Sequence, residues 1–287
     1  MTASNTTHSI ATIHPYLDLT KPRLMAIVNA TPDSFSDGGL LFKGHHLDTS
    51  LIGQRIQLLA DEGAEIIDVG GESTRPGAEP VSIQEELDRV IPIVEWAASN
   101  TKLAISVDTS SPEVMKEAAA KGAHLINDVR ALTRGDAVTV AAQSGLHVCL
   151  MHMQGSPESM QNNPDYNNVV AEVSGFLQNR VVTCLDAGIP AAKLWLDPGF
   201  GFGKSLEHNL ALLRHLPEIN SLGFPTLVGF SRKSMIGHLL KRELSDRLPG
   251  SLALALMALE RGAKVLRVHD VAETRDIIDT FIAVDQL

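Results

Sequence analysis

The chain has 287 residues, with few aromatic side chains and only two cysteines. Phe, Trp and Tyr together make up 4% of the sequence, so a hydrophobic core must be built from Val, Ile, Leu and Ala. Cys149 and Cys184 lie in apolar surroundings, without a C-x-x-C or Cys/His spacing, which argues against a disulfide scaffold and a cysteine metal site. We therefore expect two reduced core thiols in a cytoplasmic protein.

Positive charge is also scarce. The sequence holds 24 Lys and Arg against 34 Asp and Glu, a formal net charge of −10, which argues against a nucleic-acid or anionic-membrane partner. Its most apolar helical stretch, SLALALMALE (251–260), is too short to cross a bilayer. Residues 1–21 have neither the basic start nor the apolar centre of a secretory signal, and we expect residues 1–15 to be flexible.

Eight short runs rich in β-branched and aliphatic residues recur along the chain. Amphipathic helical stretches separate them, such as 81–99, where Ser82 and Glu85 predict a capping box. The eight runs favour an α/β fold, a (β/α)8 TIM barrel with a single domain over residues 16–287, and a doubly wound open sheet is the competing architecture. The runs cover residues 23–30, 64–71, 102–108, 123–129, 146–152, 193–199, 225–231 and 264–270.

Polar side chains stand where these runs end. Catalytic residues of such barrels lie at the C-terminal ends of the strands. A single Asp or Asn after a strand is more often a helix cap, but many polar residues at one rim favour a functional site. The polar residues are Asn29, Asp108, Asn127, Asp128, His152, Asp197, Ser231, Arg232, Lys233, Arg267 and His269, and the apolar Met151 stands among them.

Four residues of cationic type stand near the ends of the last two runs. Arg267 and His269 are two positions apart, so both side chains point to the same side of their strand, which we expect to be the mouth of the barrel. A buried Arg is unfavourable without a partner, and barrels often bind phosphate beside strands seven and eight. Together with Arg232 and Lys233, these residues predict an anion site.

Carboxylates and an amide form the opposite set. Asp108, Asn127 and Asp197 suit a ligand edge with several N–H donors, because carboxylates accept such donor pairs bidentately. We expect a mouth with acceptors on one wall and cations on the other. A substrate with a donor-rich heterocycle at one end and a phosphate at the other fits this arrangement.

The stretch DPGFGFGKS (197–205) looks like a phosphate loop but has the wrong spacing. In the pattern G-x-x-x-x-G-K-[ST], the first glycine position is occupied by Pro198, so nucleotide binding is not supported. We expect its glycines to make a tight loop that brings Phe200 and Phe202 over the pocket.

Six motifs in this order resemble the dihydropteroate synthase family. The first two are polar, Gly-rich loops at the predicted catalytic face, where loops often close over substrate. The resemblance extends over nearly the whole chain and is to the monofunctional form. The motifs are NATPDSFSDGG (29–39), GGESTRPGA (70–78), INDV (126–129), DPGFGFGK (197–204), GFSRKS (229–234) and LRVHD (266–270).

The resemblance implies a transferase of folate biosynthesis that joins p-aminobenzoate to 6-hydroxymethyl-7,8-dihydropterin diphosphate and releases pyrophosphate. It implies Mg²⁺ as cofactor, bridging the diphosphate to Asn29. The residues that it implies are Asp108, Asn127, Met151, Asp197 and Lys233 for the pterin; Asn29, Arg75, Arg267 and His269 for the diphosphate; Thr74, Pro76, Phe202, Lys233 and Ser234 for p-aminobenzoate; and Arg75, Lys233, Arg267 and His269 for catalysis.

The implied mechanism is dissociative, with pyrophosphate leaving before the aniline nitrogen attacks. The family is usually a homodimer through helices far from the mouth, to which the apolar residues 247–262 are able to contribute. Two alternatives stay open. A methyltransferase that uses methyltetrahydrofolate shares the pterin-binding barrel but needs no diphosphate site, and a non-catalytic paralogue binds pterin poorly and makes no product.

Overall fold

The computed structural model describes residues 14–31, 41–43, 46–73, 81–155, 160 and 164–285. Its centre is one sheet of eight parallel strands in the order β8-β7-β6-β5-β4-β1-β10-β9. A parallel bridge between Leu196 and Thr226 joins the two edge strands, so the sheet closes into a barrel. The predicted (β/α)8 TIM barrel is confirmed. The strands are β1 (Arg23–Asn29), β4 (Ile66–Gly70), β5 (Ala104–Asp108), β6 (Leu125–Asp128), β7 (His147–Met151), β8 (Leu194–Asp197), β9 (Leu227–Val228) and β10 (Val265–Val268).

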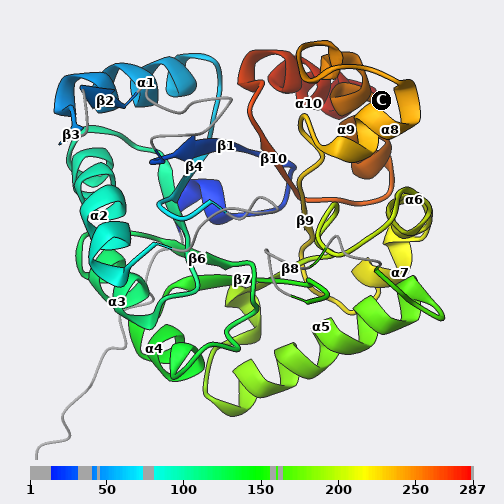
Figure 1. Cartoon of the computed structure of the whole chain (residues 1–287), viewed down its shortest axis with the longest axis horizontal. Coiled ribbons are helices and arrows are strands. Elements are labelled where there is room, and N and C mark those ends of the chain that lie inside the picture. Colours follow the sequence, from blue (N-terminus) through cyan, green and yellow to red (C-terminus); the bar gives the residue numbers. More distant parts are fainter. Residues whose placement is uncertain are drawn as a thin grey trace, which may run out of the picture.

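Helices surround the strands and connect each to the next (Figure 1). A short antiparallel hairpin, β2 (Phe42–Lys43) with β3 (His46–Leu47), precedes α1. The helices are α1 (Thr49–Asp61), α2 (Ile83–Asn100), α3 (Pro112–Ala120), α4 (Ala137–Ser144), α5 (Val169–Asp186), α6 (Leu206–Arg214), α7 (Leu216–Asn220), α8 (Ser234–Leu240), α9 (Leu248–Glu260) and α10 (Val271–Asp285). Within the described ranges, no helix is both long and apolar enough to cross a membrane.

Helix α2 shows how local sequence sets a boundary. Ser82 caps it and accepts a hydrogen bond from the backbone nitrogen of Glu85 at 3.2 Å. The other half of the predicted capping box is absent, because the Glu85 carboxylate pairs instead with Arg89, one turn later, at 2.5 Å. Because the Glu85 carboxylate forms this i,i+4 ion pair, it does not accept a hydrogen bond from the backbone nitrogen of Ser82, which a capping box requires.

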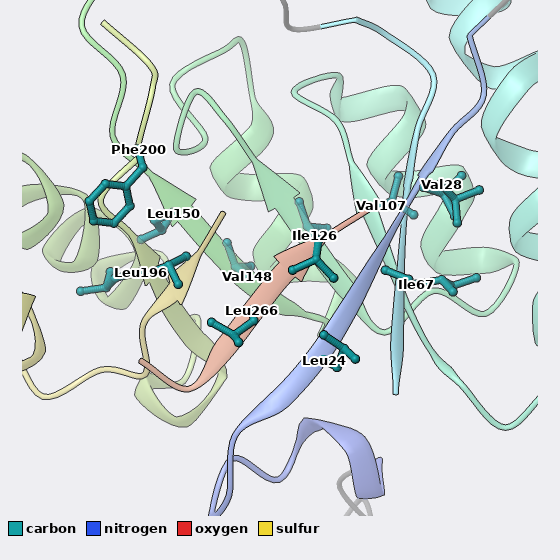
Figure 2. Close-up of a cluster of buried hydrophobic side chains, with 14 of the residues drawn as sticks. Leu24, Val28, Ile67, Val107, Ile126, Val148, Leu150, Leu196, Phe200 and Leu266 are labelled. Carbon is teal, nitrogen blue, oxygen red and sulfur yellow. The ribbon is translucent and has the colours of Figure 1, made fainter. Parts of the chain in front are cut away.

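The outer faces of the strands pack against the helices. Leu24, Val28, Ile67, Ile126 and Leu266 belong to this layer, which Figure 2 shows as a cluster of aliphatic side chains. A second layer fills the inside of the barrel near the N-terminal ends of the strands. It consists of Met25, Ile66, Ala104, Leu125, Cys149, Trp195, Leu227 and Val265, with Leu17 packed beneath. Burial on both faces explains why the strands read as continuous apolar runs.

Candidate active site

The inside of the barrel changes from apolar to polar within one step along the strands. Ile66 and Ala104 face each other in register, and two residues later Asp68 faces Ser106. Since side chains alternate along a strand, these polar residues point to the same side as the apolar layer beneath them. Three other strands show the same change from an apolar to a polar side chain two residues later. It occurs from Leu125 to Asn127 on β6, from Trp195 to Asp197 on β8 and from Val265 to Arg267 on β10.

Arg267 lies between two carboxylates at this level. Its Nε donates to Asp68 Oδ2 at 2.6 Å, and its Nη2 donates to Asp108 Oδ2 at 2.8 Å. The Arg267 side chain is 21% exposed, whereas that of Asp68 is 0% exposed. Burial raises the pKa of Asp108, and the adjacent guanidinium opposes that rise. The expectation of separate acidic and cationic walls is therefore wrong, because the cation contacts the acid directly.

Asp197 and Lys233 form the neighbouring part of the mouth. Asp197 is buried, accepts a hydrogen bond from the backbone nitrogen of Gly199 at 2.7 Å, and has its pKa raised by burial, against the opposing charge of Lys233. Burial lowers the pKa of Lys233 to about 8, which the charge of Asp197 opposes. Asp197 on β8 and Arg267 on β10 both lie two positions beyond an inward-facing residue of the apolar layer, so the two predicted groups share the inside of the barrel. Met151, buried on β7, lies beside Asp197 in register.

The two phenylalanines of the loop after β8 have different positions. The Lys233 ammonium lies over the ring of Phe202, 4.6 Å from its centroid, and donates a hydrogen bond to the carbonyl of Phe200. Phe200 itself is fully buried and packs against Phe230 with 4.3 Å between ring centroids. The expectation that both rings cover the pocket is wrong for Phe200, whose side chain belongs to the core and whose backbone holds Lys233.

A buried lysine holds this loop against the end of β7. The Lys204 ammonium lies 2.9 Å from His152 Nδ1 and 2.9 Å from the carbonyls of Gly199 and Phe202. Burial lowers the pKa of His152 to about 3, so its ring is neutral and Nδ1 can accept. Lys204 thereby fixes the loop that carries Phe202, although the sequence pattern gave no signal for this role.

His269 and Asn29 lie at the rim. His269 follows β10, and Ser231 Oγ lies 3.0 Å from its Nδ1. Asn29 is the last residue of β1 and is paired with Gly70. Arg232, predicted as part of the anion site, pairs with Asp270 at the start of α10 at 2.5 Å. Ser234 is exposed at the first position of α8.

Three predicted site residues, Thr74, Arg75 and Pro76, lie outside the described residues. Asp68 was missed among the predicted residues. Arg267 was predicted as a site residue because a charged residue inside an apolar strand, here KVLRVHD, needs a partner. Asp68 lies inside the apolar run AEIIDVGG in the same way, so the same argument predicts it.

Asn29 is the metal ligand that the resemblance predicts. No group of three or more His, Cys, Asp or Glu side chains within the described part of the chain is arranged to hold a metal. The Asn29 carboxamide stands at the mouth, and a single protein oxygen fits Mg²⁺, which keeps several waters and takes substrate phosphate oxygens. The residues present therefore fit a metal ion that arrives with a diphosphate rather than one in a dedicated protein cage.

Comparison with known proteins places these observations in a family. A family model described as "Pterin binding enzyme" matches residues 25–269. The dihydropteroate synthase of Escherichia coli K12 is 54% identical over 260 residues, 90% of each chain. The crystal structure of the Yersinia pestis dihydropteroate synthase with a sulfonamide drug complex has a TM-score of 0.90 at 49% identity, covering 94% of this chain and 96% of that one. The Xanthomonas albilineans dihydropteroate synthase with 4-aminobenzoic acid has a TM-score of 0.85 at 48% identity, covering 94% and 95%.

Proposed function

The chain belongs to the dihydropteroate synthase family of pterin binding enzymes, and on this premise we propose how the mouth of its barrel carries out the reaction. The chain is a transferase that joins p-aminobenzoate to 6-hydroxymethyl-7,8-dihydropterin diphosphate, giving 7,8-dihydropteroate and pyrophosphate. The observation that carries the assignment of residues is the convergence of Asp108, Asp197, Lys233 and Arg267 at one end of the barrel.

The pterin ring binds deepest in the mouth. Asp108 and Asp197 accept hydrogen bonds from the amino and ring N–H groups, and Asn127 accepts through its carboxamide oxygen, because its nitrogen already donates to Asp68 at 3.0 Å. Lys233 donates to the ring oxygen and nitrogen, and Met151 packs against the ring face. Hydrogen bonds to these charged groups are stronger than hydrogen bonds between neutral groups.

The diphosphate lies toward Arg267 and His269, with Asn29 at the rim. Arg75, which lies outside the described residues, is predicted as a further ligand of the diphosphate. As the bond between the pterin methylene and the diphosphate oxygen breaks, negative charge grows on the leaving pyrophosphate. The arginines and the hydrogen-bond donors around it stabilise that charge. Mg²⁺, when bound with Asn29 as its protein ligand, neutralises part of the same charge. The aniline nitrogen of p-aminobenzoate then forms the new bond to the methylene and releases a proton. The neutral amine needs no strong base and no covalent intermediate with the protein.

The p-aminobenzoate lies nearer the solvent. Phe202 and Lys233, already stacked on each other, provide an apolar face and a cation for a ring that carries a carboxylate, as a cation–π pair allows. Ser234 is the further ligand predicted here, together with Thr74 and Pro76, which lie outside the described residues. The complex of the Xanthomonas albilineans enzyme with 4-aminobenzoic acid supports binding of this substrate in the family.

The oligomeric state and location are further parts of the proposal. An apolar groove lies between α6, α8 and α9, away from the mouth, and a second copy of the chain is its expected occupant. Leu239, Leu240 and Met257 line it, and each is 44–45% exposed, an unusual amount for large apolar side chains at one place. Light scattering should give the mass of a dimer, and Leu239→Glu should give a monomer. The two free, buried cysteines support a reducing compartment, the cytoplasm.

One assay tests the function. Purified protein with Mg²⁺, pterin diphosphate and p-aminobenzoate should release pyrophosphate, and omission of either substrate should stop the release. Asp197→Asn should weaken pterin binding more than it raises the KM for p-aminobenzoate. Methyl transfer from methyltetrahydrofolate without pyrophosphate release would support the methyltransferase, and no turnover with either substrate set would support a non-catalytic paralogue.

A further inference from the structure

Asp68 makes three hydrogen bonds from the centre of the barrel, and two of them go to residues of the proposed site. It accepts from Ser106 Oγ at 2.5 Å, from Asn127 Nδ2 at 3.0 Å and from Arg267 Nε at 2.6 Å. The side chain is fully buried, with 0% exposure against 21% for Arg267. Its carboxylate is therefore occupied by protein donors and has no exposed surface to offer a substrate.

The bond to Asn127 decides which end of that amide faces the substrate. An ionised carboxylate only accepts hydrogen bonds, so the nitrogen of the Asn127 carboxamide must point toward Asp68. Asn127 is buried, and its Oδ1 is left for the mouth. Without the carboxylate, the amide is able to turn over and present a donor to a ring edge that also consists of donors.

The bond to Arg267 sets the orientation of the guanidinium. With Nε held by Asp68 and Nη2 by Asp108, the plane of the group is fixed at two points. Two bonds to two separate carboxylates give a geometric constraint that one bond does not, since the guanidinium is a rigid fork. A guanidinium that is already oriented stabilises a leaving group without reorganising during the reaction.

We propose that Asp68 is a positioning residue that acts through one buried carboxylate oxygen. It turns the Asn127 amide so that its oxygen faces the pterin ring, and it fixes the orientation of the Arg267 guanidinium. Both bonds end on the same atom, Oδ2, while Oδ1 takes the Ser106 hydroxyl. The recognition of the pterin ring and the stabilisation of the leaving diphosphate therefore depend on a single residue that touches neither. This inference rests on the proposed function.

The test compares Asp68→Ala with Asp68→Asn. A carboxamide at this position is able to turn its nitrogen toward the Ser106 hydroxyl and keep its oxygen where Oδ2 stands, so both positioning bonds persist without the charge. Calorimetry should measure binding of 6-hydroxymethylpterin, which has no diphosphate, and of pyrophosphate. Asp68→Ala should raise the dissociation constant of each ligand by on the order of tenfold or more. Asp68→Asn should recover most of both losses, and the KM for p-aminobenzoate should change less than about threefold in either variant, because that ligand lies outside the two bonds.

Ser106→Ala is the matched control. It removes the third hydrogen bond of Asp68 and touches neither Asn127 nor Arg267, so it should leave both affinities within about twofold of wild type. A change in Asp68→Ala that is equal for the pterin, pyrophosphate and p-aminobenzoate would show a general disturbance of the barrel and overturn the inference. Asp68→Asn with no recovery over Asp68→Ala would also overturn it.

A double-substitution cycle keeps the inference testable if Asp68→Ala does not fold. Asp68→Leu, which is close in shape to aspartate but accepts no hydrogen bond, should weaken pyrophosphate binding in the wild-type background. In the Arg267→Ala background it should no longer affect pyrophosphate binding, because the residue through which Asp68 acts is gone. An effect of the same size in both backgrounds would contradict the inference. Ligand binding also separates this inference from the proposed function: a wild-type protein that binds both probes but makes no 7,8-dihydropteroate defeats the function alone.

Discussion

The hydroxyl oxygen of Ser231 lies 3.0 Å from Nδ1 of His269 and 3.1 Å from the backbone nitrogen of the same residue. Because Oγ accepts the backbone N–H, its own hydrogen is available to donate to Nδ1. A neutral His269 ring held in this way carries its hydrogen on Nε2, where it is a donor. The Ser231 hydroxyl is able to donate to Nδ1 or to accept from it. We predict that it donates, which leaves an Nε2–H for an anionic leaving group.

Ser231→Ala should lower kcat for pyrophosphate release by on the order of tenfold, because the ring loses the bond that fixes its tautomer. Ser231→Thr keeps a hydroxyl and should retain most of the rate. Steady-state kinetics of all three proteins check this, with the KM for p-aminobenzoate as an internal reference. Equal rates in the alanine and wild-type proteins would show that the hydroxyl has no part in catalysis.

Arg267→Ala should lose about 3 kcal/mol of transition-state stabilisation and also destabilise the fold, since it leaves the carboxylates of Asp68 and Asp108 without their cation. Burial raises the pKa of Asp108, and Arg267 opposes the rise, so the substitution raises that pKa further. An acid whose folded pKa is raised above its unfolded pKa lowers stability at high pH. The loss shrinks as the pH falls from the folded pKa toward the unfolded pKa.

Urea unfolding of the Arg267→Ala variant at about pH 8 and about pH 5 checks the second effect. The variant should lie closer to wild type in free energy of unfolding at the lower pH. A deficit that grows on acidification would contradict the assignment of Arg267 as the partner of these acids.

Pterin binding should weaken as the pH falls. Burial raises the pKa values of both Asp108 and Asp197, so protons begin to compete with the ring donors at a pH above the usual carboxyl range. Below the pKa of a carboxylate that the ligand requires, the dissociation constant should rise by about tenfold per pH unit. Calorimetry with 6-hydroxymethylpterin from about pH 8 to about pH 5 measures this, and a flat profile in wild type would contradict it. Asp108→Asn should bind more weakly but with a shallower pH dependence.

Gly199→Ala should destabilise the protein more than Gly188→Ala, although both glycines have positive φ. A Cβ at Gly199 would lie 1.9 Å from the carbonyl oxygen of His152, whereas at Gly188 it would meet nothing within 4 Å. The left-handed conformation alone should cost about 1 kcal/mol at Gly188, and at Gly199 the loop must also move away from β7. Urea unfolding of both variants gives the comparison, and equal losses would show that the loop and β7 are not in close contact.

The fold was predictable from the sequence because its signal is local. Each apolar run contains a strand, and residue 267 points into the barrel because side chains alternate. An apolar run is longer than its strand where the backbone turns before the run ends. The run 225–231 contains only the two-residue strand Leu227–Val228, since the chain turns soon afterwards through Arg232, whose φ is 60°.

The pairings within the site were not predictable, because they depend on how strands far apart in sequence meet across the barrel. Arg267 and Asp68 are separated by 199 positions, and only the closed barrel brings them together. Phe200 shows the same limit: the residues around it predict a loop at the mouth, and the tertiary packing turns the ring into the core. The roles proposed for Thr74, Arg75 and Pro76 stay predictions, since these residues lie outside the described ranges.

A crystal structure with 6-hydroxymethylpterin and pyrophosphate bound together tests the central claim most directly. The ring edge should meet Asp108, Asn127 and Asp197, and the pyrophosphate should lie against Arg267 and His269 in the same mouth. A pterin bound away from Asp197, or two ligands in separate cavities, would contradict the proposed assignment of these residues.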